Sequence, residues 1–298
     1  MTLTSPTVPP SILPKILPSY GSIEIDRLHI YLGQGKHAFE ALQDVSLKVK
    51  PGEFVVILGP SGCGKSTLLG ALAGHLIPSR GKILVDAEAV RGPHPERGLV
   101  FQHHTLFPWK SVLDNVAFGL KMKGIKREER HAKARDLLKL VGLEGFEKHY
   151  PTQLSGGMMQ RVEIARVLIN HPRVMLMDEP FGALDAQTRL MMQQLLLEVW
   201  ERIQTSIVFI THDIDEALFL ADRILVMSPR PGRIIEEIAL PFARPRTADL
   251  VTSSAFIELK RHCLALLHPE GKSHPLARLT PLGITPAAIP ASRLQFAI

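Results

Sequence analysis

The chain has 298 residues, of which 45% are hydrophobic, a formal net charge of +6 and two cysteines. Its length suits one large α/β domain with an appendage, or two small domains. Two cysteines, Cys63 and Cys263, exclude a disulfide framework and indicate a reducing compartment. No apolar run approaches the ~20 residues of a membrane-spanning helix, the N-terminal residues lack the apolar core of a signal peptide, and the basic residues form no dense block. We therefore expect a soluble cytosolic protein with a generic basic surface, which can still dock on a membrane partner.

The first part of the chain predicts a disordered segment and then β-structure. Residues 1–21 are rich in Pro and Ser, a composition typical of disorder. Residues 23–30 and 45–49 alternate between apolar and polar side chains, as half-buried strands do. Lys50-Pro51-Gly52-Glu53 has Pro and Gly at the central positions of a type II turn. We expect this turn to close a hairpin that leads into the apolar strand 54–58.

A glycine-rich loop follows that strand and matches the pattern G-x-x-x-x-G-K-[ST]. Helix-forming residues 68–73 come after it, so strand, loop and helix stand in the order that a phosphate-binding loop requires. Backbone N–H groups and the helix dipole would face the phosphates, Lys65 would add a charge, and the Ser66 hydroxyl could bind Mg²⁺. The loop is therefore predicted to bind a nucleoside triphosphate through Gly59, Pro60, Ser61, Gly62, Cys63, Gly64, Lys65, Ser66 and Thr67. Since Cys63 lies inside this loop, we expect a thiol reagent to reach it.

The rest of the chain alternates buried strands with helices, which predicts an α/β fold with a largely parallel sheet. Strand character marks residues 82–85, 99–101, 173–178, 206–211 and 223–227, with an edge strand at 232–240. Helical spacing marks residues 127–141, 162–170, 188–203 and 213–221, the first of these ending at Gly142. After residue 245 turn residues return, and we expect either a short helix at 255–267 with a loose end or an entirely mobile tail.

Asp178-Glu179-Pro180 ends one of these buried strands. A carboxylate at a strand end suits an outer contact to Mg²⁺, which we assign to Asp178. Glu179 is then placed to activate the attacking water as general base. Pro180 disfavours a helical backbone at Glu179 and keeps that side chain at the strand tip.

Ser155, Gly156 and Gly157 precede a helix and describe a second anion site, with free N–H groups and a helix dipole. A second phosphate-facing helix start is redundant for one nucleotide in one chain. It becomes useful if it faces the γ-phosphate of ATP held by another copy.

The run Leu154–Gly157 resembles the signature motif of ABC-type ATPases, and the resemblance extends over residues 22–242. It implies a P-loop NTPase core with a mostly parallel sheet, an antiparallel β subdomain and an inserted helical subdomain at about 103–170. Residues 243–298 would then be a C-terminal extension, a short helix followed by a mobile Pro-rich tail.

The resemblance also implies roles for single residues. Gln102 matches the glutamine that senses Mg²⁺ and contacts the membrane subunit, so the metal ligands would be Ser66, Gln102 and Asp178. Asp185 matches the D-loop, and His212 matches the histidine that contacts the γ-phosphate. Catalysis would rest on Glu179, His212 and Lys65. Tyr31 is our choice for the aromatic ring that stacks on adenine, with Phe39 second. We expect the remaining histidines on the surface.

Two residues depart from the family pattern, and a third suggests a contact. Met158 stands where the signature usually has glutamine, and we expect activity to survive this change. Glu163 stands where small residues are usual; it could pair with Arg166 one turn on or repel phosphate. Trp109, just after Gln102, reads either as an exposed anchor for a membrane partner or as a core residue of the helical subdomain.

Residues 96–102, 106–109 and 211–217 resemble the branch of importers for nitrate, sulfonate, taurine and bicarbonate. This resemblance implies an ATP-hydrolysing, energy-coupling subunit of an importer for a small anion, using ATP and Mg²⁺. It would pair head to tail with a second copy or a homologous ATPase subunit and dock on transmembrane permease subunits, fed indirectly by a substrate-binding protein. Its place would be peripheral, on the cytoplasmic face of the inner membrane, and no nucleic acid is expected.

Two alternatives remain. A nucleic-acid-handling ATPase of the same superfamily would carry a long coiled coil between Gln102 and Leu154, but the intervening residues show no heptads. A small-molecule P-loop kinase would not account for Ser155–Gly157, Asp185 and His212 together.

Overall fold

The computed structural model describes residues 19–267. Most of the N-terminal segment that we predicted to be disordered, and the Pro-rich tail from residue 268 on, lie outside these residues. The last residue of that segment is fixed, because the N–H group of Gly21 donates to Asp86 Oδ1 at 2.7 Å, as does that of the next residue, Ser22, at 2.9 Å.

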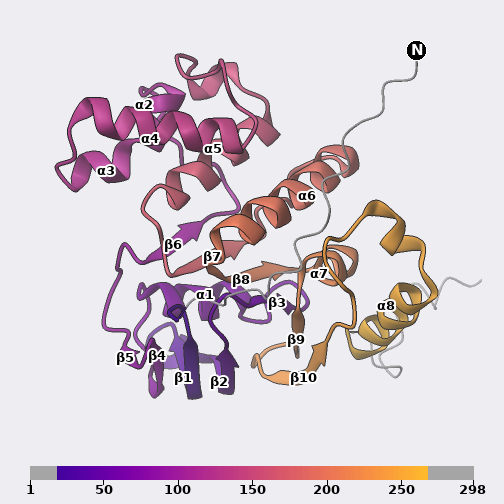
Figure 1. The fold of residues 1–298 in the computed structure, drawn as a ribbon. Coiled ribbons are helices and arrows are strands. Elements are labelled where there is room, and N and C mark those ends of the chain that lie inside the picture. The colour runs from indigo at the N-terminus through magenta and orange to yellow at the C-terminus, as the bar shows by residue number, and fades with distance from the viewer. Residues whose placement is uncertain (1–18, 268–298) are drawn as a thin grey trace, which may run out of the picture. The chain divides into compact units, whose positions relative to one another are not determined.

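A six-stranded sheet forms the centre of the fold, in the order β10-β9-β3-β8-β7-β6 (Figure 1). Its strands are parallel except β10, which pairs antiparallel with β9 at the edge. This confirms the predicted largely parallel sheet with an added edge strand. The strands are β3 (Phe54–Leu58), β6 (Arg97–Val100), β7 (Val174–Asp178), β8 (Ser206–Thr211), β9 (Arg223–Met227) and β10 (Ile234–Ala239).

A four-stranded antiparallel sheet, in the order β2-β1-β4-β5, lies beside the central one. Its strands are β1 (Ile23–Leu32), β2 (Phe39–Val49), β4 (Arg80–Val85) and β5 (Glu88–Ala89), with a 3₁₀ turn at Gly35–His37. The predicted hairpin is wrong. The turn at residues 50–53 does form, with Glu53 N–H donating to Lys50 O at 3.1 Å and Gly52 at φ 68°, but β2 pairs with β1 while β3 enters the other sheet. All five residues of β3 are apolar and buried, which suits a central strand between β8 and β9.

The helices divide into two groups. The helices α1 (Lys65–Ala73), α6 (Ala186–Ile203) and α7 (Ile214–Leu220) belong to the central α/β core, and α2 (Val112–Val116), α3 (Phe118–Met122), α4 (Arg127–Leu140) and α5 (Gly156–Leu168) pack on one another as a helical group (Figure 1). Gly142 has φ 68°, so the predicted glycine stop after α4 is confirmed. Short 3₁₀ turns stand at Pro151–Gln153 and Ala248–Thr252.

Strand β3 shows how the central sheet is covered on both faces. Phe54, Val56 and Leu58 pack into one apolar cluster with the helices α6 and α7, whereas Val55 and Ile57 pack into another with α1 and the antiparallel sheet. Since side chains alternate across a strand, a five-residue apolar run serves both clusters and holds the end of β3 in place.

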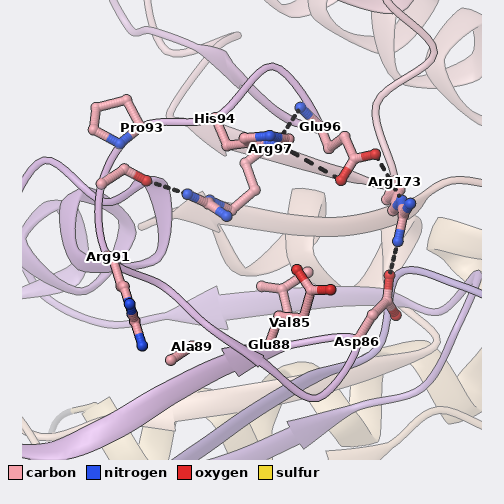
Figure 2. A pocket seen from close by; sticks show the side chains of 11 residues that line it. Val85, Asp86, Glu88, Ala89, Arg91, Pro93, His94, Glu96, Arg97 and Arg173 are labelled. Atoms are coloured by element: carbon pink, nitrogen blue, oxygen red, sulfur yellow. Dashed lines mark hydrogen bonds and ion pairs between the residues drawn. The ribbon is translucent and has the colours of Figure 1, made fainter.

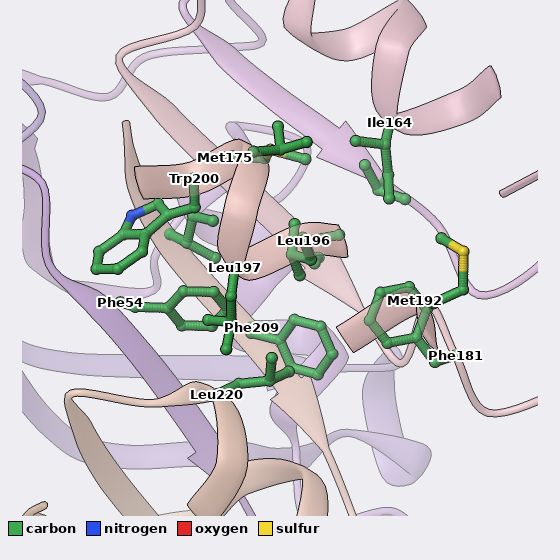
Figure 3. Packing of buried hydrophobic residues seen from close by; sticks show 14 of the residues in the cluster. Phe54, Ile164, Met175, Phe181, Met192, Leu196, Leu197, Trp200, Phe209 and Leu220 are labelled. Carbon is green, nitrogen blue, oxygen red and sulfur yellow. The ribbon is translucent and has the colours of Figure 1, made fainter. Parts of the chain in front are cut away.

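Aromatic rings fill the first of these clusters (Figure 3). The ring of Trp200 meets that of Phe54 edge to face at 5.6 Å between centroids, and its Nε1–H donates to Thr205 O at 2.9 Å. Edge-to-face pairs of this kind contribute about 0.5–1.5 kcal/mol beyond the area that they bury.

The predicted short C-terminal helix is confirmed as α8 (Ser254–Leu267). The ring of its buried Phe256 stacks on that of Phe242, with 6.0 Å between the centroids. Cys263 is fully buried and belongs to the same apolar cluster as Phe54 and Trp200. The alternative of an entirely mobile tail from residue 245 is therefore wrong up to residue 267. Among residues 19–267, no helix has the length and apolar character to cross a bilayer.

Candidate functional site

The glycine loop joins the buried end of β3 to the first turn of α1. Gly62 and Gly64 have φ of 76° and 109°, and a Cβ on Gly64 would lie 2.9 Å from Ala41 O. No side chain caps the start of α1, so its first N–H groups are left free for an anion.

Lys65 is held inside the loop, with only 5% of the residue exposed. Its Nζ donates to Gly59 O at 2.8 Å and to Pro60 O at 3.1 Å, and lies 3.6 Å from Glu179 Oε1. The first two loop residues thus act through their carbonyls, which aim the ammonium group.

A cavity of about 320 Å³ opens over the loop. It brings Gln102 and Glu179, which are far apart in the sequence, against the loop. Its lining consists of Leu32, Phe39, Ala41, Ser61, Gly62, Gly64, Lys65, Ser66, Thr67, Gln102, Glu179 and Arg230. No sequence motif predicted that Arg230 would lie here. Its guanidinium lies 4.4 Å from the centroid of the Phe39 ring, and its Nη2 donates to Gly62 O at 3.3 Å.

The structure favours Phe39 over Tyr31 as the aromatic residue of this cavity. Leu32 pairs with Phe39 and Tyr31 pairs with Glu40 across β1 and β2, and the alternation of side chains places these two pairs on opposite faces. Leu32 and Phe39 line the cavity, whereas Tyr31 stands outside it. A hydrogen bond with Glu40 raises the pKa of the Tyr31 phenol. Our first choice is therefore corrected to the second.

The structure also corrects the expectation that Cys63 is accessible in the loop. Its side chain is 1% exposed and belongs to the core cluster under the loop rather than to the cavity lining. Burial raises the pKa of its thiol, which further lowers its reactivity. The expectation that a thiol reagent reaches Cys63 does not fit this geometry.

Two oxygen groups that could hold a hard cation lie together: Ser66 lines the cavity, and Asp178 lies beside it outside the lining. Ser66 Oγ donates to Asp178 Oδ1 at 3.1 Å, and burial raises the pKa of the Asp178 carboxyl, an effect that the Ser66 hydrogen bond partly offsets. Mg²⁺ binds oxygens at about 2.0–2.1 Å in octahedral geometry, so adjacent ligands stand about 3 Å apart. The two residues fit that ion, and Gln102 lines the same cavity.

Glu179 occupies a strained position after β7. Its φ of 43° is unusual for a residue other than glycine and costs about 1–3 kcal/mol; this conformation agrees with the expectation that Pro180 keeps it out of a right-handed helix. Glu179 Oε2 lies 2.9 Å from His212 Nδ1, while Oε1 faces Lys65. His212 has 55% of its side chain exposed and does not line the cavity, so it reaches the site through Glu179.

Ser155 caps α5, and its Oγ accepts from Met158 N–H at 3.3 Å. The helix begins at Gly156, six residues before the predicted start, because this cap satisfies an N–H group of the first turn. Asp185 similarly caps α6, accepting from Thr188 N–H at 3.0 Å, and its hydrogen bonds with Thr188 lower its pKa. Ser155 and Asp185 are exposed, and neither they nor Gly156 and Gly157 line the cavity.

Two expectations about single residues are settled. Trp109 is 72% exposed, so it is not a core residue of the helical group. His131 is only 8% exposed and its Nε2 lies 3.0 Å from Asp114 Oδ1, so the expectation that every remaining histidine is on the surface is wrong there.

A second cavity, of about 370 Å³, lies between β4, β5 and the loop before β6 (Figure 2). In this cavity Arg173 forms ion pairs with Asp86 at 3.2 Å and with Glu96 at 3.0 Å. The charges of these three residues therefore largely neutralise one another. The glycine loop, Ser66 and Glu179 meet instead at the smaller cavity, which we take as the candidate site.

Comparisons with known proteins point to one family. The family model for ABC transporters matches residues 42–182. A taurine import ATP-binding protein of Rhizobium johnstonii is 53% identical over 76% of this chain and 89% of its own length. An uncharacterised ABC transporter ATP-binding protein of Methanocaldococcus jannaschii is 50% identical over 78% of this chain and 85% of its own. Among solved structures, a dimeric ATP-binding cassette bound to ADP and phosphate is 35% identical, with a TM-score of 0.65 over 74% of this chain and 100% of that one. A Clostridium perfringens protein that is part of an ABC transporter complex is 29% identical, with a TM-score of 0.68 over 84% of this chain and 96% of that one.

Proposed function

This chain belongs to the ABC transporter family and is an ATP hydrolase, and we propose that it drives the import of taurine or a related small sulfonate. The observation that carries the ATPase part is the meeting of Lys65, Ser66 and Glu179 at one cavity, with Asp178 hydrogen-bonded to Ser66. The import part is supported by relatives named as taurine import proteins, such as one from Pseudomonas putida that is 49% identical over 78% of this chain.

ATP would lie with its phosphates on the free N–H groups of the loop and on Lys65 Nζ. Phe39 at the cavity wall would take the adenine, with Arg230 beside it. Ser66 and Asp178 would hold Mg²⁺, with Gln102 as a further ligand; when bound, this ion neutralises charge on the phosphates. Because Lys65 now faces Glu179 Oε1 at 3.6 Å, an arriving γ-phosphate would compete with Glu179 for the ammonium group.

Glu179 would act as general base and take a proton from the attacking water. In the present structure its two oxygens face Lys65 and His212, so the carboxylate is held aside from a water nucleophile. When Lys65 turns to phosphate and His212 turns to the γ-phosphate, Glu179 would be released for this role.

The second half of the site would come from another copy or a homologous subunit. Ser155, Gly157 and Asp185 do not line their own chain's cavity, and Ser155 stands exposed at the start of a 13-residue helix. A head-to-tail pair would place this helix start against the partner's nucleotide. The dimeric form of a solved cassette with 35% identity supports this arrangement.

A permease helix would dock beside the helical group. A groove of about 420 Å³ there is lined by apolar and aromatic residues such as Leu99, Phe107 and Phe118. Polar and charged side chains, among them Arg97, Arg166 and Asn170, complete the lining. Trp109 packs against Phe107 at 5.8 Å between ring centroids and is 72% exposed, which suits an interface anchor. This docking would hold the chain on the cytoplasmic face of the membrane, next to a permease fed by a substrate-binding protein.

Uptake of labelled substrate tests the proposal. Cells whose copy of this chain carries Glu179→Gln should lose uptake of taurine while keeping their uptake of unrelated solutes. Loss of nitrate or bicarbonate uptake, with taurine uptake intact, would contradict the sulfonate assignment. Intact uptake of all three anions would contradict a role in anion import.

A further inference from the structure

Glu163 is a buried carboxylate on α5 that the nucleotide site does not use. Its side chain is 2% exposed. It accepts from the N–H of Thr105 and from Thr105 Oγ1, the latter at 3.1 Å, and its Oε2 faces His104 Nδ1 at 3.5 Å. These contacts fasten the stretch after Gln102 to the middle of the helix.

Arg166, one turn further along α5, holds the same stretch. Its Nη1 donates to Thr105 O at 2.8 Å and its Nη2 donates to Thr105 Oγ1. Its guanidinium lies 5.6 Å from the Phe107 ring and 3.9 Å from Glu163 Oε1. Glu163 thus binds the backbone N–H of Thr105, and Arg166 binds its backbone carbonyl.

The fastened stretch links two parts of the molecule. Gln102 precedes it and lines the nucleotide cavity. Exposed Trp109 follows it and packs against Phe107, which lines the proposed permease groove. The helix that holds it, α5, begins at Gly156 and is capped by Ser155. Glu163 is eight residues from Ser155, which is roughly 12 Å along a helix.

We propose that Glu163 and Arg166 are positioning residues that make the stretch 104–107 move as one body with α5, so that movement of the permease sets the position of Ser155 on the partner's ATP. This inference rests on the proposed function. A buried carboxylate costs desolvation that an apolar residue would avoid, yet it fixes one backbone N–H at one place on the helix. The helix then transmits displacement without bending over its two intervening turns.

The first experiment compares ATP hydrolysis by the chain alone with hydrolysis by the intact complex, purified from membranes through a tag on this chain. Glu163→Ala should leave the rate of the chain alone within about twofold of wild type and lower stimulation by the membrane subunits about five-fold or more. Glu163→Gln should keep part of the stimulation, because its amide oxygen still accepts from Thr105 N–H. Glu216→Gln is the matched control, since Glu216 is also buried, on α7, and meets Gln193 at 3.1 Å instead; it should keep full stimulation.

The second experiment measures hydrogen exchange of the Thr105 amide in the folded full chain. Glu163→Ala should speed this exchange at least tenfold and leave the amides of α6 and α8 unchanged. Unchanged exchange would overturn the proposal, and so would unchanged stimulation, or an equal loss of rate in the chain alone and in the complex. A wild-type complex that hydrolyses no ATP would instead refute the proposed function itself.

Discussion

The substitution Glu179→Gln separates binding from chemistry at the candidate site. The carboxylate is 17% exposed and faces Lys65 at 3.6 Å and His212 at 2.9 Å. Glutamine has nearly the same shape, so the loop geometry is kept while the negative charge and the proton acceptor are lost.

The expected sizes follow from these distances. Loss of a general base lowers hydrolysis by about 10²–10⁴-fold. A pair of unit charges 3.6 Å apart interacts by about 1 kcal/mol in bulk water and by about 5 kcal/mol at an effective dielectric constant near 20. In the variant, Lys65 can bind phosphate without first breaking an ion pair, so ATP affinity should rise. If 1.4 kcal/mol of that ion-pair energy is recovered, the increase is about tenfold.

Two assays read these effects. Phosphate release measures hydrolysis, and size-exclusion chromatography with Mg²⁺-ATP measures the trapped dimer that slow hydrolysis should accumulate. The matched control is Glu163→Gln, which also neutralises a buried carboxylate but lies outside the cavity lining. Hydrolysis at the wild-type rate in Glu179→Gln would contradict its role as general base, and weaker ATP binding than in wild type would contradict its competition with phosphate for Lys65.

Four further measurements test the nucleotide contacts, the burial of Cys63 and the titration of Glu216. Lys65→Ala should weaken ATP binding by about 1.5–3 kcal/mol for each charged hydrogen bond lost, measured by calorimetry, and unchanged affinity would count against the loop. Phe39→Ala should weaken ATP more than Tyr31→Ala does; the reverse order would restore Tyr31 as the adenine contact. Cys63 should stay unmodified by maleimide in the folded chain and react on unfolding, as followed by mass spectrometry, and fast labelling of the folded chain would contradict its burial. Burial raises the pKa of Glu216 to about 7. The folded state therefore binds a proton that the unfolded state releases, and the free energy of unfolding should fall as pH rises from about 4.5 to 7. Glu216→Gln should flatten this slope in urea titrations, and an equal slope in both proteins would rule out Glu216 as its source.

Features that depend on local sequence were predictable. Strand 54–58, the glycine loop and the turn at 50–53 each follow from residues that are neighbours in the chain. The stop at Gly142 and the carboxylates at the end of β7 are of the same kind. Local conformational preferences and spacing decide these features, and the structure contains them at the expected places.

Features that depend on packing were not predictable in the same way. The choice between Tyr31 and Phe39 turns on the register of β1 against β2, because a shift of one residue moves a side chain to the other face. Burial of Cys63 depends on the core beneath the loop. Arg230 reaches Gly62 across 168 positions of sequence, and no local pattern signals such a contact.

The central claim, that each ATP is hydrolysed between two chains, is tested most directly by the rate per chain as a function of chain concentration. Phosphate release should be measured across the range in which light scattering shows the chain passing from monomer to dimer. The rate per chain should rise with concentration and level off once dimers predominate, because Ser155 must come from the second copy. A rate per chain that is constant down to concentrations at which the chain is monomeric would contradict it.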